Sequence, residues 1–183
     1  MDEVCTDCAA GTSRLNSMRF SLHPATAEDA VPLAALHTAV ADHLTSKHGR
    51  GPWSARTSEQ GVLYALRASR VFVAREGNEI VGALRLTTRK PWAIDASSFT
   101  PCDTPLYLLA MAITPARQRQ GYGRRLLEEA KQLARAWPAG ALRLDAFDAD
   151  AGAGPFYARY GFTEVARASY RQTPLIYYEL LLA

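Results

Sequence analysis

Two glycines, Gly121 and Gly123, stand where an almost continuously apolar segment, residues 106–113, is followed by a helical pattern. The first amides of a helix have no acceptor within the helix, and the helix dipole adds about half a positive charge at that end. Glycine has no Cβ, so the backbone at this turn can approach and bind a phosphate. Four arginines surround the turn: Arg117, Arg119, Arg124 and Arg125. These residues predict an anion site, and a tight turn with a solvated basic face is the alternative.

Two better-known glycine motifs do not fit this turn. A Walker phosphate loop requires Gly-x-x-x-x-Gly-Lys-Ser/Thr, and the sequence contains no such run. A dinucleotide fingerprint requires a third glycine, and Leu126 occupies its place. Neither motif therefore identifies the ligand.

The apolar pattern on either side of this turn predicts an α+β fold, in which helices pack on a mixed sheet. Alternating or continuous apolar runs predict strands over residues 19–23, 71–74, 79–88, 106–113, 141–147, 162–168 and 175–182. Apolar residues at three- and four-residue steps predict helices over residues 28–47, 58–68, 121–137 and 154–160. A loop over residues 90–105 holds three prolines. We expect so long a loop to be functional.

The run Gln118–Gly123 reads Gln-Arg-Gln-Gly-Tyr-Gly and resembles motif A of the GNAT superfamily of N-acetyltransferases, whose pattern is Gln/Arg-x-x-Gly-x-Gly/Ala. Its context is similar too, since a buried strand precedes it and a Tyr-x-x-x-Gly-Phe segment follows at residues 157–162. The motifs match over residues 106–162, and the element order matches over residues 18–183. The resemblance implies the GNAT fold: a mixed, twisted sheet of six to seven strands, flanked by about four helices and splayed between strands 4 and 5.

The resemblance also implies a reaction, the direct transfer of an acetyl group from acetyl-CoA to a primary amine of a small molecule or peptide. The amides of residues 119–124 would hold the CoA pyrophosphate, and residues 111–113 would pair with pantetheine. A bulged amide near Met111 would stabilise the oxyanion, an effect worth about 3–4 kcal/mol of barrier. Tyr157 stands in the place of the family's acid, and a phenol holds a proton to donate at neutral pH. A core aromatic is the alternative for this tyrosine.

The residues that the resemblance assigns to acetyl-CoA binding are Met111, Ala112, Ile113, Gln118, Arg119, Gln120, Gly121, Tyr122, Gly123, Arg124 and Asp150. Asp150 departs from the family, because many relatives carry asparagine seven residues before the tyrosine. This departure puts pantetheine contacts from the loop around Asp150 in question, and it leaves the pyrophosphate site as it is.

No motif names the general base or the acceptor. A protonated amine cannot attack, so a base is needed, and the candidates are Asp145, Asp148, His43, His48 and Asp95. Surface solvation is the usual alternative for such groups. Three aromatic residues, Trp53, Trp92 and Tyr107, are candidates for lining an acceptor pocket, and core packing is the alternative for each.

Two other functions remain open beside the enzyme. One is a non-catalytic acyl-CoA sensor or interaction module that keeps the phosphate turn. The other is an enzyme that binds a different phosphorylated ligand there.

Composition narrows the partners. Lys and Arg total 21 against 18 Asp and Glu, a net charge of +3 that does not favour nucleic-acid binding. No apolar run approaches the roughly 20 residues of a membrane span. Cys5 and Cys8 have metal-ligand spacing, but only Cys102 remains as a third cysteine, so we expect no metal site. The odd cysteine count and the lack of a secretory pattern favour the cytoplasm. We expect residues 1–17 to be a flexible extension of a domain over residues 18–183, which, as in many relatives, is expected to form a homodimer.

Overall fold

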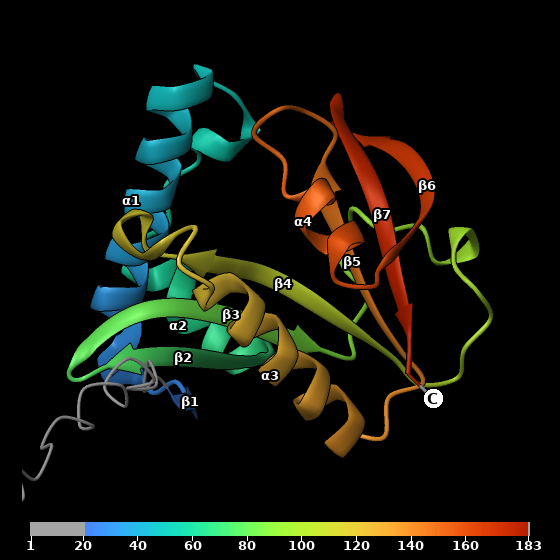
Figure 1. Ribbon diagram of the computed structural model, residues 1–183, viewed down its shortest axis with the longest axis horizontal. Coiled ribbons are helices and arrows are strands. Elements are labelled where there is room, and N and C mark those ends of the chain that lie inside the picture. The colour runs from blue at the N-terminus through green and yellow to red at the C-terminus, as the bar shows by residue number, and fades with distance from the viewer. Residues whose placement is uncertain (1–20, 183) are drawn as a thin grey trace, which may run out of the picture.

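The computed structural model describes residues 21–182, a seven-stranded sheet with helices on both faces (Figure 1). The strands are β1 (Ser21–Pro24), β2 (Arg70–Glu76), β3 (Glu79–Thr87), β4 (Pro105–Ile113), β5 (Ala141–Phe147), β6 (Thr163–Tyr170) and β7 (Thr173–Leu181). The α-helices are α1 (Ala30–His48), α2 (Glu59–Ala68), α3 (Tyr122–Ala136) and α4 (Gly154–Arg159). The predicted fold class is confirmed over this part of the chain. The predicted extension, residues 1–17, and the predicted start of the domain lie outside the described residues.

The sheet separates into two halves between β4 and β5. Its order is β1-β2-β3-β4-β5-β7-β6, and β4–β5 is the parallel pair in an otherwise antiparallel sheet. This parallel ladder runs only from the pair Pro105–Ala141 to the pair Tyr107–Arg143. The rest of β4 pairs with β3 alone, and the rest of β5 pairs with β7. The two strands part toward their carboxyl ends, which confirms the predicted splay between strands 4 and 5.

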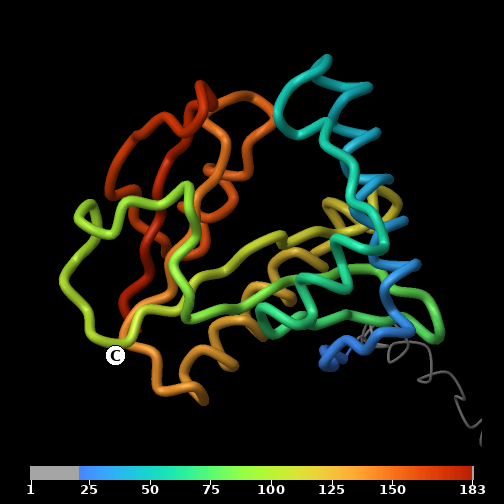
Figure 2. The backbone as a smooth tube through the Cα atoms, turned by 180° about the vertical axis from the view of Figure 1, so that it is seen from behind, coloured from blue at the N-terminus to red at the C-terminus, as the bar shows by residue number. Residues whose placement is uncertain are grey.

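The helices divide between the two faces of the sheet (Figures 1 and 2). Helices α1 and α2 pack on one face, where Leu33 and Val62 share an apolar cluster with residues of β2 and β3. Helices α3 and α4 pack on the other face, where Leu126 and Tyr157 share a larger cluster with Leu144 of β5. The gap between β4 and β5 therefore has α1 and α2 on one face of the sheet and α3 and α4 on the other.

The β6–β7 hairpin differs from the prediction. Both strands extend to a tight turn at Arg171 and Gln172, whose φ angles are 48° and 66°. The usual sequence signal for such a turn is Asn-Gly or Asp-Gly, because positive φ is costly for most other residues. Because that signal is missing, the predicted first strand ends too early, at residue 168, and the predicted second strand begins too late, at residue 175.

A buried ion pair joins β5 to β7 and fastens the long loop before β4. Arg143 Nε donates to Glu179 Oε1 at 2.9 Å, and both side chains are 4% exposed. The Arg143 guanidinium also donates to the carbonyl of Thr100, whose amide donates to Glu179 Oε2 at 3.2 Å. The pair therefore holds the loop against the sheet through both the carbonyl oxygen and the amide nitrogen of Thr100.

We expect Glu179→Ala to lower the free energy of unfolding by about 3–5 kcal/mol, because it leaves the Arg143 guanidinium buried without its counter-charge. Urea unfolding at equilibrium measures this change. The matched control is Glu164→Ala, which removes an exposed pair with Arg167 at 2.8 Å and is expected to cost less than about 1 kcal/mol. Equal effects of the two substitutions would show that the buried pair contributes no more than a surface one.

Candidate functional site

Strand β4 carries a bulge where it leaves β5. Between the pairs Ala83–Ala112 and Arg85–Leu109, two residues of β4, Ala110 and Met111, lie opposite one residue of β3. Ala110 has a φ of 48°, in the left-handed region that alanine seldom occupies. Backbone strain of this kind persists where the surrounding structure enforces it, and it concentrates at functional sites. The bulge turns the backbone out of the ladder at the position expected for an oxyanion donor.

The second backbone feature is the start of α3. Gly121 caps the helix with a φ of 87°, a conformation that favours glycine. The first helical hydrogen bond runs from the Arg125 amide to the Gly121 carbonyl at 3.1 Å, so the amides of Gly123 and Arg124 have no acceptor within the helix. Gln118 Nε2 donates to the carbonyl of Ile113 at 3.1 Å and ties the turn to the end of β4. The predicted anion-binding turn is therefore built from local backbone geometry.

One cleft of about 650 Å³ joins these two features, between the end of β4, the start of α3 and α4. The predicted residues that line it are Met111, Ala112, Ile113, Gln118, Arg119, Gly121, Gly123, Arg124 and Tyr157. Further lining residues, which sequence reasoning did not single out as binding residues, come from α4 and its flanks: Ala153, Pro155, Phe156, Arg159 and Tyr160. The signal that could have identified them was the predicted short helix over residues 154–160, in which only Tyr157 was assigned a role.

Three predicted binding residues do not line the cleft. The Tyr122 side chain is buried, and its hydroxyl donates to Glu76 Oε1 at 2.7 Å. Gln120 Nε2 donates to the carbonyl of Ala116 at 2.8 Å, and Asp150 lies exposed in the loop before α4. Arg117, one of the four arginines at the turn, pairs with Glu76 at 2.7 Å. The positive side chains that face the cleft are those of Arg119, Arg124 and Arg159.

Tyr157, in α4, also lines the cleft. Its ring packs edge-on against Phe156 and Phe162, with centroids 5.3 and 5.6 Å away, and the residue is 8% exposed. Its hydroxyl makes no hydrogen bond to any residue of the 21–182 range. Burial, and then the negative charge of Asp145, raise the pKa of Tyr157 well above its ordinary value. The phenol therefore carries its proton throughout the physiological pH range.

Asp145, the first candidate base, lies half-buried in β5. Leu144 and Ala146 belong to the cluster beneath α3 and α4, so Asp145 faces the side of α1 and α2. Burial raises the pKa of its carboxyl, toward the range in which a general base is effective. Its charge also acts on Tyr157, which packs on the other face of the sheet.

The other candidate bases are placed differently. Asp148 is paired with Arg167 at 2.9 Å, and Asp95 is exposed, where it accepts the Ser97 amide at 3.0 Å. His43 is exposed and His48 half-buried near the end of α1. None of these four residues lines the cleft, and neither does Asp145.

The three aromatic candidates for an acceptor pocket occupy different surroundings. Trp53, between α1 and α2, packs edge-on against Phe147 at the end of β5, with centroids 5.9 Å apart. This contact closes the α1–α2 side of the splay. Tyr107 is buried in a core cluster with Phe99 and serves packing, whereas Trp92 is 82% exposed.

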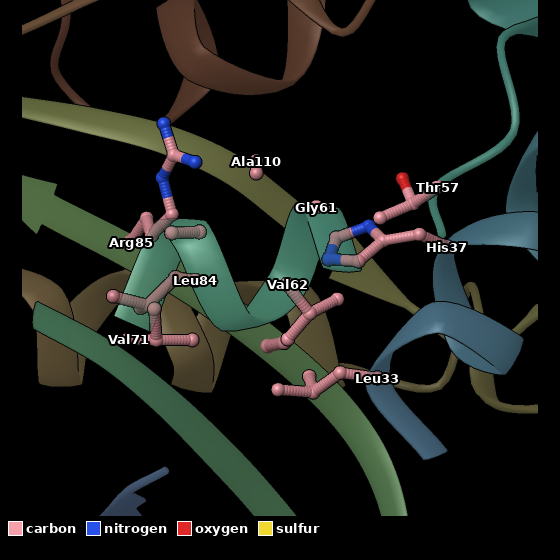
Figure 3. A pocket seen from close by; sticks show the side chains of 11 residues that line it. Leu33, His37, Thr57, Gly61, Val62, Val71, Leu84, Arg85 and Ala110 are labelled. Atoms are coloured by element: carbon pink, nitrogen blue, oxygen red, sulfur yellow. The ribbon is translucent and has the colours of Figure 1, made fainter. Parts of the chain in front are cut away.

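A second pocket lies on the α1–α2 side and is lined by polar groups that the sequence analysis did not single out (Figure 3). Arg85 of β3, His37 of α1 and Thr57 before α2 face a space of about 110 Å³ beside Ala110. A signal for Arg85 was present, because it is a lone charge within the apolar run of residues 80–86.

Over residues 21–182, no three His, Cys, Asp or Glu side chains gather as a metal site would require, and Cys102 is a free thiol. Cys5 and Cys8 lie outside this range. Within the same range, no helix combines the length and apolar character of a membrane span.

Comparison with known proteins agrees with this geometry. The model of the acetyltransferase (GNAT) family matches residues 37–162. Similar solved structures include a GNAT-family protein from Desulfovibrio desulfuricans, with 20% identity and a TM-score of 0.68 over 90% of this chain and 100% of that one. A ribosomal-protein-alanine N-acetyltransferase from Brucella melitensis has 18% identity and a TM-score of 0.67 over 88% and 99%. A GNAT-family acetyltransferase from Elizabethkingia anophelis with acetyl-CoA bound has 19% identity and a TM-score of 0.57 over 89% and 98%. At these identities, the similarity to solved structures shows the fold.

Proposed function

Since the chain belongs to the acetyltransferase (GNAT) family, we propose that it is an N-acetyltransferase that moves an acetyl group from acetyl-CoA to a primary amine. The observation that carries the proposal is the single cleft that joins an anion-binding helix start to a strand bulge and a buried, protonated tyrosine. A diphosphate, an extended arm and a thioester need these three environments in that order. The acceptor is a small-molecule or peptide amine.

The residues of the cleft fit acetyl-CoA. The amides of Gly123 and Arg124 would hold its diphosphate, with the side chains of Arg119 and Arg124 as counter-charges. Among residues 21–182, none pairs with the end of β4 on its β5 side, so the backbone of residues 111–113 is available to an extended ligand that binds like an added strand. When bound there, acetyl-CoA supplies the activated acyl group.

The protein's own groups would act as follows. The amide at the bulge near Met111 donates a hydrogen bond to the oxygen on which negative charge develops. Asp145 accepts a proton from the amine, whose nitrogen forms the new bond to the acetyl carbon as the bond from carbon to sulfur breaks. Tyr157 donates its proton to the departing sulfur. The products are an N-acetylated amine and a free thiol.

Asp145 and Tyr157 are coupled through charge. The negative charge of Asp145 contributes to the raised pKa of Tyr157. When Asp145 takes the proton of the amine, its negative charge disappears. The pKa of Tyr157 then falls by the part that this charge had contributed. Tyr157 then becomes a stronger acid at the stage at which the leaving sulfur needs a proton, so base and acid act in sequence.

Binding of acetyl-CoA is tested by substitutions at Gly123. A Cβ there would lie 3.4 Å from Phe156, an ordinary contact, and both glutamate and glutamine have a higher helix propensity than glycine. We expect Gly123→Glu to weaken acetyl-CoA binding at least about tenfold more than Gly123→Gln does, because only the former sets a carboxylate against the diphosphate.

Calorimetry with acetyl-CoA, CoA and plain nucleotides measures these affinities. Equal affinities of the two variants for acetyl-CoA would show that the diphosphate does not bind at the start of α3. Tighter binding of a plain nucleotide than of acetyl-CoA would instead favour an enzyme for another phosphorylated ligand.

A further inference from the structure

The pocket beside Ala110 contains a cation without a counter-charge. Arg85 is half-buried in β3, and its Nε is fully buried without a hydrogen-bond partner. Its guanidinium makes no ion pair with any carboxylate of residues 21–182, whereas the fully buried Arg143 is paired with Glu179 and also bonds to Thr100. An arginine stays protonated at all physiological pH values, so this charge is permanent. Burying it without a partner costs free energy, which a bound anion would recover.

The remaining polar groups of the pocket are neutral hydrogen-bonding groups. In Figure 3, Arg85 lies on one side of α2 and His37 and Thr57 lie on the other, with Ala110 between them. Burial, and then the charge of Arg85, lower the pKa of His37, which keeps its ring neutral at pH 7. Apolar side chains, among them Leu33 and Val62, form the floor. The pocket therefore offers one positive charge and two neutral partners.

The pocket adjoins the reaction site proposed above through the backbone of β4. Ala110 lines it, and the next residue, Met111, lines the acetyl-CoA cleft on the opposite face of the sheet. Consecutive Cα atoms are about 3.8 Å apart, so a group held beside Ala110 lies close to the bulge. Asp145, the proposed base, faces the same side of the sheet as this pocket.

We propose that Arg85 binds a carboxylate of the acceptor in the pocket that Thr57 and His37 also line, so that the substrate is an amine that carries a carboxylate a few bonds away, as a free amino acid does. This inference rests on the proposed function. A guanidinium and a carboxylate match in a bidentate geometry. The single positive charge suits a monoanion rather than a phosphate dianion, and a space of about 110 Å³ admits a carboxylate but not a large headgroup.

The first test compares matched acceptors. Free L-amino acids, their carboxamides and the corresponding amines without the carboxyl group are offered with acetyl-CoA, and thiol release is followed. In the wild-type protein we expect at least one amino acid to exceed its carboxamide about tenfold or more in kcat/KM, mainly through KM. In Arg85→Met this ratio falls to about one, whereas in Arg89→Met, which changes an exposed arginine four residues along the chain, it stays as in the wild type.

The second test does not depend on turnover. Removing an unpaired, half-buried charge is expected to raise the Tm of the free protein by about 2–4 °C in Arg85→Met, the opposite of what loss of a structural arginine would do. Amino acids are expected to raise the Tm of the wild-type protein in the presence of CoA more than their carboxamides do, and to lose this advantage in Arg85→Met.

The outcomes separate this inference from the function on which it rests. Acetyl transfer without any preference for amino acids over carboxamides overturns the carboxylate site and keeps the enzyme. Absence of any carboxylate-dependent Tm shift, with acetyl-CoA binding intact, also overturns it. Failure to bind acetyl-CoA at all overturns the proposed function instead.

Discussion

Tyr157→Phe is expected to lower kcat by about 100- to 10,000-fold, the usual contribution of a general acid, while the affinity for acetyl-CoA changes less than about threefold. The substitution removes only the hydroxyl. The ring contacts with Phe156 and Phe162 remain, and the hydroxyl has no hydrogen bond within residues 21–182 whose loss would destabilise the fold. Steady-state thiol release gives kcat, and calorimetry gives the affinity.

The matched control is Tyr178→Phe. This second buried tyrosine packs near Tyr157, with ring centroids 6.2 Å apart, but does not line the cleft. Its substitution is expected to change kcat less than about threefold. If Tyr157→Phe retains wild-type turnover, the thiolate departs without that acid. If the wild-type protein binds acetyl-CoA yet turns over no amine, the chain is a sensor rather than an enzyme.

Asp145→Asn is expected to lower kcat/KM at pH 7 by about 100- to 10,000-fold, because the amine then has no group to take its proton. The deficit should shrink as the pH rises, since a growing fraction of the amine reaches the site already deprotonated. A pH profile of kcat/KM for both proteins measures this convergence. A deficit that stays constant with pH would assign Asp145 to structure rather than to proton transfer.

A stability measurement and a control variant test whether the lower activity expected of Asp145→Asn comes from the loss of the base. Burial raises the pKa of the Asp145 carboxyl, so the folded state binds its proton more tightly than the unfolded state does. Ionisation near neutral pH therefore costs stability, and Asp145→Asn should not lower the Tm at pH 7. Asp148→Asn, three residues along and paired with Arg167 at the surface, is the control and is expected to keep kcat/KM within about threefold.

The part of the site that could be predicted from the sequence is the part made of contiguous backbone. The turn from β4 into α3 and the position of Tyr157 follow from glycine placement, apolar runs and helix periodicity within single segments. The predicted family and fold are confirmed by the family match and the splayed sheet. The side-chain directions of Tyr122 and Gln120 did not follow from the same motif, because Tyr122 bonds to Glu76 in β2 and Gln120 folds back on its own loop.

The sequence by itself determined the α+β class, the order of the elements and the glycine turn at the start of α3, because each depends on interactions between residues near one another in the chain. Only the tertiary structure decided which acidic residues are buried, which arginine lacks a counter-charge among residues 21–182 and which aromatic residues are core. Asp145 and Tyr157 come from different elements, as do Arg85 and His37. Burial and the nearness of charges set pKa values and binding, and both arise when segments far apart in the chain pack together.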